Sequence, residues 1–182
     1  MLKWFMKRRL GTFGRAFGYD TSHVVDLIDG DAAAGIALAR LSAAAAYRAD
    51  APAAGWYAAK IVAAMSEDCG PCVQLAVTMA GRGGVSASDL RAIVAGEVVR
   101  MSADASLGYR FALAVLERSE TLDELRGEIL GRWGRRALGA ISVNIAATRT
   151  FPTLKHALGH GRSCRSVEIG GTAVAPARLA HA

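Results

Sequence analysis

Cys69 and Cys72 are the residues of this chain whose type and spacing best suit chemistry. They enclose the sequence Cys-Gly-Pro-Cys, between two alanine-rich stretches with helical spacing. Two thiols three positions apart can form and break a disulfide reversibly. The positive end of a helix dipole favours the thiolate that such chemistry needs. The sequence therefore predicts a redox-active pair at the start of a helix.

Several ionisable groups are candidates to support this pair. Glu67 is the first candidate for a base, because the sequence alone places it beside a thiol. We expect Cys69 to have the lower thiol pKa, because it lies nearest the helix N-terminus and should be the more exposed cysteine. His23 is interpreted as a surface or capping histidine. Further supporting groups are Asp68, Tyr57, Lys60, and the two histidines of a C-terminal helix, His156 and His160.

Three other interpretations of the cysteines remain open. Thioredoxins share the Cys-Gly-Pro-Cys tetrapeptide, but they place a strand before it, whereas residues 52–66 have helical spacing. A zinc site would need His156, His160 or Cys164 as further ligands, and it would lack the second close pair of common zinc motifs. The pair could also be structural, and Cys164 is either a further redox partner or a semi-buried cysteine. We expect neither a metal nor a cofactor.

The stretch from Trp56 to Val99 resembles the carboxymuconolactone decarboxylase/alkylhydroperoxidase D-like family. The shared pattern is a helix, one or two acids, Cys-x-x-Cys opening the next helix, a glycine-containing turn and a Ser-x-x-Asp/Glu helix start. The following helices resemble that family more loosely. The resemblance implies an all-α bundle that assembles as a homo-oligomer, in trimers, hexamers or similar rings.

In the peroxidase branch of that family, the resemblance implies that Cys72 attacks peroxide and Cys69 resolves the product. A histidine four residues after the second cysteine and a glutamate twelve before the first provide the base there. Ala76 and Tyr57 occupy those positions here. Losing a general base typically costs about 10²- to 10⁴-fold in rate. The resemblance thus makes Cys72 the attacking thiol, whereas the helix-terminus argument favours Cys69. In either case a group other than this histidine–glutamate pair must act as the base.

The rest of the chain predicts an all-α fold, because apolar residues recur every three or four positions between capping and breaking residues. Thr121 and Glu124 form a capping-box pattern. The only weak strand signal is 166–169. We expect an arm at 1–18, one helical domain at 19–164 and a loop-like tail at 165–182. The expected helices of the domain cover about 21–30, 31–48, 52–66, 69–80, 86–99, 103–118, 121–133, 135–148 and 152–160.

Much of the positive charge belongs to the N-terminal arm. Of 22 Lys and Arg residues, five precede Asp20, and the remaining 17 nearly balance 16 acids. We therefore expect no nucleic acid partner. Apolar residues spaced three or four apart predict an amphipathic helix in this arm, packed on its own domain or a sister subunit, or lying on an anionic membrane. These residues are Leu2, Met6, Leu10, Phe13 and Phe17.

No apolar run reaches the ~18 residues that a membrane span needs, and basic residues 7–9 interrupt any signal-peptide core. We expect a cytoplasmic protein, with membrane association through the arm as a further possibility.

The leading hypothesis is a thiol-dependent oxidoreductase that takes a peroxide or a disulfide and is re-reduced by an external thiol. One alternative is a non-catalytic helical oligomer that binds a membrane or a partner through its arm. A further alternative is a decarboxylase-type lyase.

Overall fold

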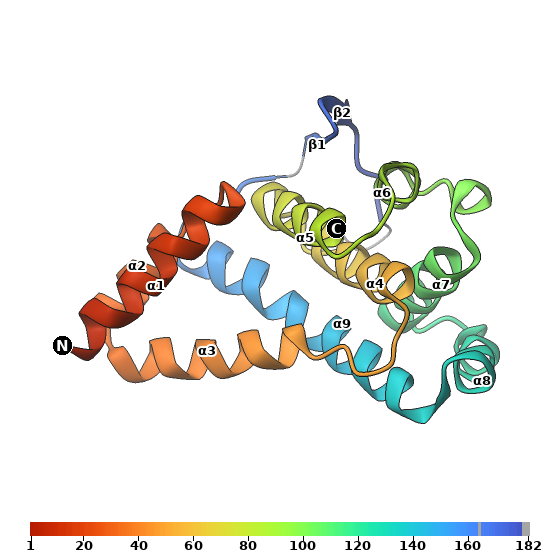
Figure 1. The fold of residues 1–182 in the computed structure, drawn as a ribbon, viewed down its shortest axis with the longest axis horizontal. Coiled ribbons are helices and arrows are strands. Elements are labelled where there is room, and N and C mark those ends of the chain that lie inside the picture. Colours follow the sequence, from red (N-terminus) through yellow and green to blue (C-terminus); the bar gives the residue numbers. More distant parts are fainter. Residues whose placement is uncertain (164, 180–182) are drawn as a thin grey trace.

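The computed structural model describes residues 1–163 and 165–179 of the 182-residue chain, and nearly all of its regular structure is helical. On one side lie α1 (Leu2–Phe17), α2 (Ser22–Gly30) and α3 (Ala32–Ala46) (Figure 1). On the other lie α4 (Ala53–Met65), α5 (Gly70–Arg82), α6 (Ala87–Ala95), the 3₁₀ turn η1 (Val98–Arg100), α7 (Ala103–Glu117) and α8 (Leu122–Arg132). The long helix α9 (Gly134–Ala157) runs between the two sides. The prediction of an all-α fold is confirmed.

Helix α4 is the centre of the core. From Ala58 to Met65 every side chain is buried, and all of these residues except Lys60 are apolar, as expected for a helix buried on all sides. It packs against α5, α7 and α9. Where α4 crosses α7, glycines bring the backbones together: a Cβ on Gly108 would overlap the backbone of Gly55. The position of Cys69 follows from this packing, because α4 ends only four residues before it.

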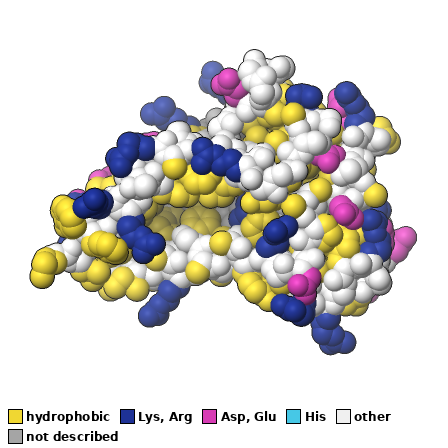
Figure 2. Space-filling model, viewed as in Figure 1, with side chains coloured by type: hydrophobic (Ala, Val, Ile, Leu, Met, Phe, Trp, Pro, Cys, Tyr) yellow, Lys and Arg dark blue, Asp and Glu magenta, His cyan; other side chains and the backbone are white. Residues whose placement is uncertain are grey.

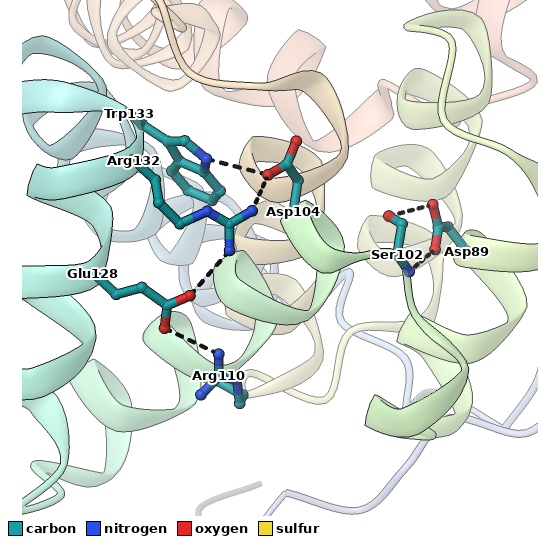
Figure 3. A network of polar contacts seen from close by, with 7 residues as sticks. All are labelled: Asp89, Ser102, Asp104, Arg110, Glu128, Arg132 and Trp133. Carbon is teal, nitrogen blue, oxygen red and sulfur yellow. Dashed lines mark hydrogen bonds and ion pairs between the residues drawn. The ribbon is translucent and has the colours of Figure 1, made fainter.

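A polar network joins α7, α8 and the start of α9 (Figure 3). The carboxylate of Asp104 accepts hydrogen bonds from the Arg132 guanidinium at 2.8 Å and from the Trp133 indole N–H at 3.2 Å. Glu128 in turn accepts from Arg132 at 3.0 Å and from Arg110 at 3.2 Å. These contacts fix Trp133, whose ring covers Gly55 on α4.

Two expectations about helix ends are wrong, a break at Pro152 and a capping box at Thr121. The break expected at Pro152 is absent, and α9 continues through it to Ala157. Pro152 removes one helical N–H, but it is fully buried, so packing offsets the lost hydrogen bond. The capping box at Thr121 is also absent. Thr121 has helical backbone angles and its side chain caps no N–H, while Ser119 accepts from the Thr121 N–H at 3.2 Å.

The tail differs from the expected loop. β1 (Val167–Ile169) and β2 (Thr172–Val174) form an antiparallel hairpin. Gly170 and Gly171 form its two-residue turn with φ of 59° and 77°, as a type I′ turn requires. Val167 and Ile169 are buried in the core. The Gln74 side chain on α5 holds β1 by a hydrogen bond in each direction with the Glu168 backbone, at 3.0 and 2.8 Å.

The N-terminal arm forms the expected amphipathic helix, α1. Its inner side contacts the rest of the chain: Met6 packs against Gly35 of α3, and Lys7 pairs with Asp29 of α2. Leu2, Trp4 and Phe5 are exposed at its N-terminal end. Figure 2 shows a hollow with a largely hydrophobic floor between α1 and α3, and with Lys and Arg side chains on its rim.

Assembly and membrane contact stay predictions for this single chain. Within residues 1–163 and 165–179, every helix is too short or too polar to cross a bilayer.

Candidate functional site

A disulfide joins Cys69 to Cys72 at the junction of α4 and α5, with their Cα atoms 5.3 Å apart. The motif follows a helix and not a strand, as the sequence predicted. Cys69 is the N-cap residue of α5, and Pro71 lies in its first turn, where a proline costs no hydrogen bond. The chain reaches this start through Asp68, whose φ of 44° turns it sharply out of α4. Aspartate tolerates this left-handed conformation better than most residues.

The two cysteines differ in accessibility, opposite to our expectation. Cys69 is completely buried, whereas 7% of Cys72 is exposed. The expectation that Cys69 is the more exposed thiol is therefore wrong. Of the two residues, only Cys72 has any exposed surface.

The first turn of α5 has no N–H group left to bind a thiolate. The Gly70 N–H donates to the Arg162 carbonyl at 2.9 Å, Pro71 has no N–H, and the Cys72 and Val73 N–H groups both donate to the Cys69 carbonyl at 3.0 Å. The helix can therefore stabilise a thiolate through its dipole only. Any direct hydrogen bond must come from another part of the chain.

Tyr19 supplies such a hydrogen bond. Its hydroxyl lies 3.9 Å from the Cys72 Sγ, and the disulfide sulfur can only accept. Burial, reinforced by the nearby Asp20 carboxylate, raises the pKa of Tyr19 to about 12, so the hydroxyl keeps its proton at neutral pH. The Lys155 ammonium lies over the Tyr19 ring, 4.6 Å from its centre. The sequence analysis missed both Tyr19 and Lys155.

His23 completes this group from α2. Its ring lies edge-on to Tyr19 with 6.0 Å between centroids, and at the same distance from the His160 ring. It is buried, so the interpretation as a surface histidine is wrong, and its Nδ1 has no hydrogen-bond partner among the residues that the structure describes. Burial, with the positive charge of Lys155, lowers the pKa of His23 to about 4. His23 is therefore neutral in the folded protein.

This burial predicts a pH-dependent stability. An unfolded histidine takes up a proton near its ordinary pKa of 6.5, whereas folded His23 does so only near 4. Between these values the unfolded state binds more protons. The free energy of unfolding should therefore fall as pH falls from about 6.5 to 4.5, by on the order of 2 kcal/mol. Urea titrations at pH 7 and pH 4.5 measure the difference.

The control for this prediction is His23→Phe, which keeps a ring but cannot titrate. The difference between pH 7 and pH 4.5 should shrink to well under half in this variant. An unchanged difference would assign the effect to another group facing His23. Those groups are Tyr19, Asp20, Asp26, Lys155 and His160.

Glu67 and Asp68 lie beside the motif, as their sequence positions require. Both oxygens of the Glu67 carboxylate contact α9: one pairs with Arg149, and the other accepts from the Thr153 hydroxyl at 3.1 Å. These contacts tie the end of α4 to α9. They also compete with the role of Glu67 as a base, which stays a prediction.

Tyr57 lies away from the disulfide. Its ring packs on Gly83, which caps the C-terminal end of α5. Cys72 is eleven positions earlier, about 16 Å along the helix axis.

Lys60 is buried in a separate polar network of α3, α4 and α9. Its ammonium donates to the Ala45 carbonyl at 2.8 Å and to the Thr148 hydroxyl at 3.2 Å. Burial lowers the Lys60 pKa to about 8. The hydrogen bonds direct this ammonium toward Thr148 of α9 and the end of α3, and none is made to the motif.

Of the two C-terminal histidines, His160 is near the motif. It lines the same small cavity as Pro71, and its Nε2 donates to the Asp26 carboxylate at 3.1 Å. His156 is exposed on the last turn of α9, with its ring against Gly161. Since α9 ends at Ala157, the two do not share a helical face. Cys164 lies outside the described residues, so its two expected roles stay predictions. Among the described residues, no cluster of three His, Cys, Asp or Glu side chains suits a metal.

No family model, curated protein or solved structure matches this chain. Its function is therefore inferred from its own geometry.

Proposed function

We propose that this protein is a thiol-dependent oxidoreductase whose redox centre is the Cys69–Cys72 pair, as in the alkylhydroperoxidase D-like proteins that its sequence resembles. The observation that carries the proposal is a disulfide whose two residues differ in burial: Cys69 is completely buried, whereas 7% of Cys72 is exposed. A purely structural crosslink has no need of such asymmetry. Cys72 is the sulfur that exchanges with substrate, and buried Cys69 resolves the product.

In the reduced protein, the Cys72 thiolate attacks the substrate. With a peroxide, the O–O bond breaks, an alcohol or water leaves, and Cys72 becomes a sulfenic acid. With a disulfide, one thiolate leaves and a mixed disulfide forms on Cys72. Cys69 then attacks the Cys72 sulfur and releases water or the second thiol. Two molecules of an external thiol re-reduce the resulting disulfide and become a disulfide themselves.

Tyr19 supports the attacking role of Cys72. A hydroxyl that stays protonated can donate to a thiolate but not accept its proton, so it lowers the thiol pKa without acting as a base. This contribution differs from that of the absent histidine–glutamate pair, because it stabilises the thiolate once formed. The buried Lys155 ammonium over the Tyr19 ring adds a positive charge near this hydroxyl.

The test is a redox titration of the whole protein in dithiothreitol buffers, with free thiols trapped by alkylation and counted by mass. We expect one two-electron transition for the Cys69–Cys72 pair, with the helical circular-dichroism signal unchanged across it. The transition should be absent in Cys69→Ser and in Cys72→Ser. Oxidation that occurs only with loss of helical signal would reject a redox role, and the non-catalytic scaffold would then be the better hypothesis.

A further inference from the structure

A cavity of about 210 Å³ lies against the motif, where the end of α9 and the loop after it meet α5 and the start of α2. Pro71, between the two cysteines, forms part of its wall. Its polar lining comes from Asp20, Lys155, His160 and Arg162. The cavity therefore borders the motif at the residue bonded to Cys72, the cysteine that is not completely buried.

Lys155 is the most unusual group in this wall. Its side chain is 2% exposed, yet among the described residues no carboxylate lies within ion-pair distance of its ammonium. Its ammonium lies over the face of the Tyr19 ring, 4.6 Å from the ring centre. A buried charge without a counter-ion is costly. Burial, together with the positive charge of Arg162, lowers the pKa of Lys155, and Asp20 only partly opposes this.

The other charged groups leave the cavity net positive. Asp20 is already engaged by the Ser22 N–H at 2.9 Å and by the Ser22 hydroxyl at 3.0 Å. The Nε2 of His160 is turned to Asp26. Arg162 is exposed, and within residues 1–163 and 165–179 its guanidinium forms no ion pair. Two cations thus face one carboxylate that has other partners.

We propose that this cavity binds the carboxylate of a small anionic thiol, which is the external reductant of the Cys69–Cys72 disulfide. This inference rests on the proposed function. The carboxylate lies against Lys155 and Arg162, and the thiolate attacks the Cys72 Sγ. The Cys69–Cys72 bond breaks, Cys69 leaves as a thiolate, and a second thiol releases the product disulfide. A spacer of two or three carbons suits this, because Tyr19 contacts both groups: the Lys155 ammonium lies 4.6 Å from its ring centre, and its hydroxyl lies 3.9 Å from the Cys72 Sγ.

The experiment reduces the oxidised protein with three thiols of similar size: 3-mercaptopropionate, 2-mercaptoethanol and cysteamine. Each rate is divided by that of the same thiol with bis(2-hydroxyethyl) disulfide, which removes differences in thiol pKa and nucleophilicity. At low salt we expect the anionic thiol to exceed the neutral one by about tenfold and the cationic thiol to be slowest, as for a cleft of one charge sign. Added sodium chloride should reduce the difference.

Arg162→Gln should remove most of this preference, and Lys155→Gln should do the same if the variant folds. The matched control is Arg165→Gln, an exposed arginine of the same loop that does not line the cavity. An equal loss in the control would assign the effect to net charge and reject the site. Equal normalised rates for the three thiols would also reject it.

Failure of all three thiols to reduce the protein would reject the proposed function but not the cavity. Propionate, which has no sulfur, tests the cavity separately through the backbone amide NMR signals of Gly159 and Gly161. We expect saturable shifts that are lost in Arg162→Gln and kept in Arg165→Gln. Absence of such shifts would overturn the carboxylate site.

Discussion

Iodoacetamide is expected to modify Cys72 in a Cys69→Ser variant at least about 100-fold faster than Cys69 in a Cys72→Ser variant. Both variants carry Cys164→Ser, so that each protein has one thiol. Cys69 is completely buried and can react only when this part of the chain opens, which has its own free-energy cost. Cys72 is partly exposed and has the Tyr19 hydroxyl beside its sulfur. Peptide mass spectrometry over time gives both rates.

A second reagent tests the order of the two steps. With bis(2-hydroxyethyl) disulfide, Cys69→Ser should accumulate a mixed disulfide on Cys72, because the resolving thiol is missing. The protein with both cysteines should pass directly to the Cys69–Cys72 disulfide. Faster modification of Cys69 than of Cys72 would contradict the burial argument. Cys69 would then be the attacking thiol, as the helix-terminus argument first predicted.

The sequence predicts the helices well because their signals are local. Asp31 illustrates this: the helix expected at about 31–48 begins at Ala32, and the Asp31 carboxylate caps it by accepting from the Ala33 N–H at 2.9 Å. The failures are places where distant packing overrides a local signal. Pro152 normally ends or starts a helix, but in α9 its ring is fully buried and the helix continues.

Of the groups that form the candidate site around the disulfide, the sequence pointed clearly only to the two cysteines. Tyr19 is 53 positions before Cys72 and has no motif of its own, so its hydroxyl contact depends on how α1 and α2 fold back. Lys155 appears in the sequence as an ordinary basic residue near a helix C-terminus. Its burial becomes visible only when α9 is placed against Tyr19. The helix-dipole argument considered α5 alone, and it therefore chose the wrong cysteine as the exposed one.

The packing of α4 on α7 predicts the largest change in stability. Gly108→Ala places a methyl group where the Gly55 backbone already lies. Backbone atoms cannot rotate away as a side chain can, so the two helices must separate. We expect the free energy of unfolding to fall by about 3 kcal/mol or more, the upper end for overpacked cores. Urea unfolding followed by circular dichroism measures the change.

Gly139→Ala on α9 is the matched control, because a Cβ there meets no atom within 4 Å. It should raise the free energy of unfolding by about 0.5 to 1 kcal/mol, since alanine is the better helix former. A Gly108→Ala protein within about 1 kcal/mol of the natural chain would show that α4 and α7 are not held this closely. Because α4 ends at the motif, the Gly108→Ala variant should also make Cys69 react faster with iodoacetamide in a Cys72→Ser background. If the Gly108→Ala variant loses stability but Cys69 does not react faster, the packing of α4 on α7 does not control access to Cys69.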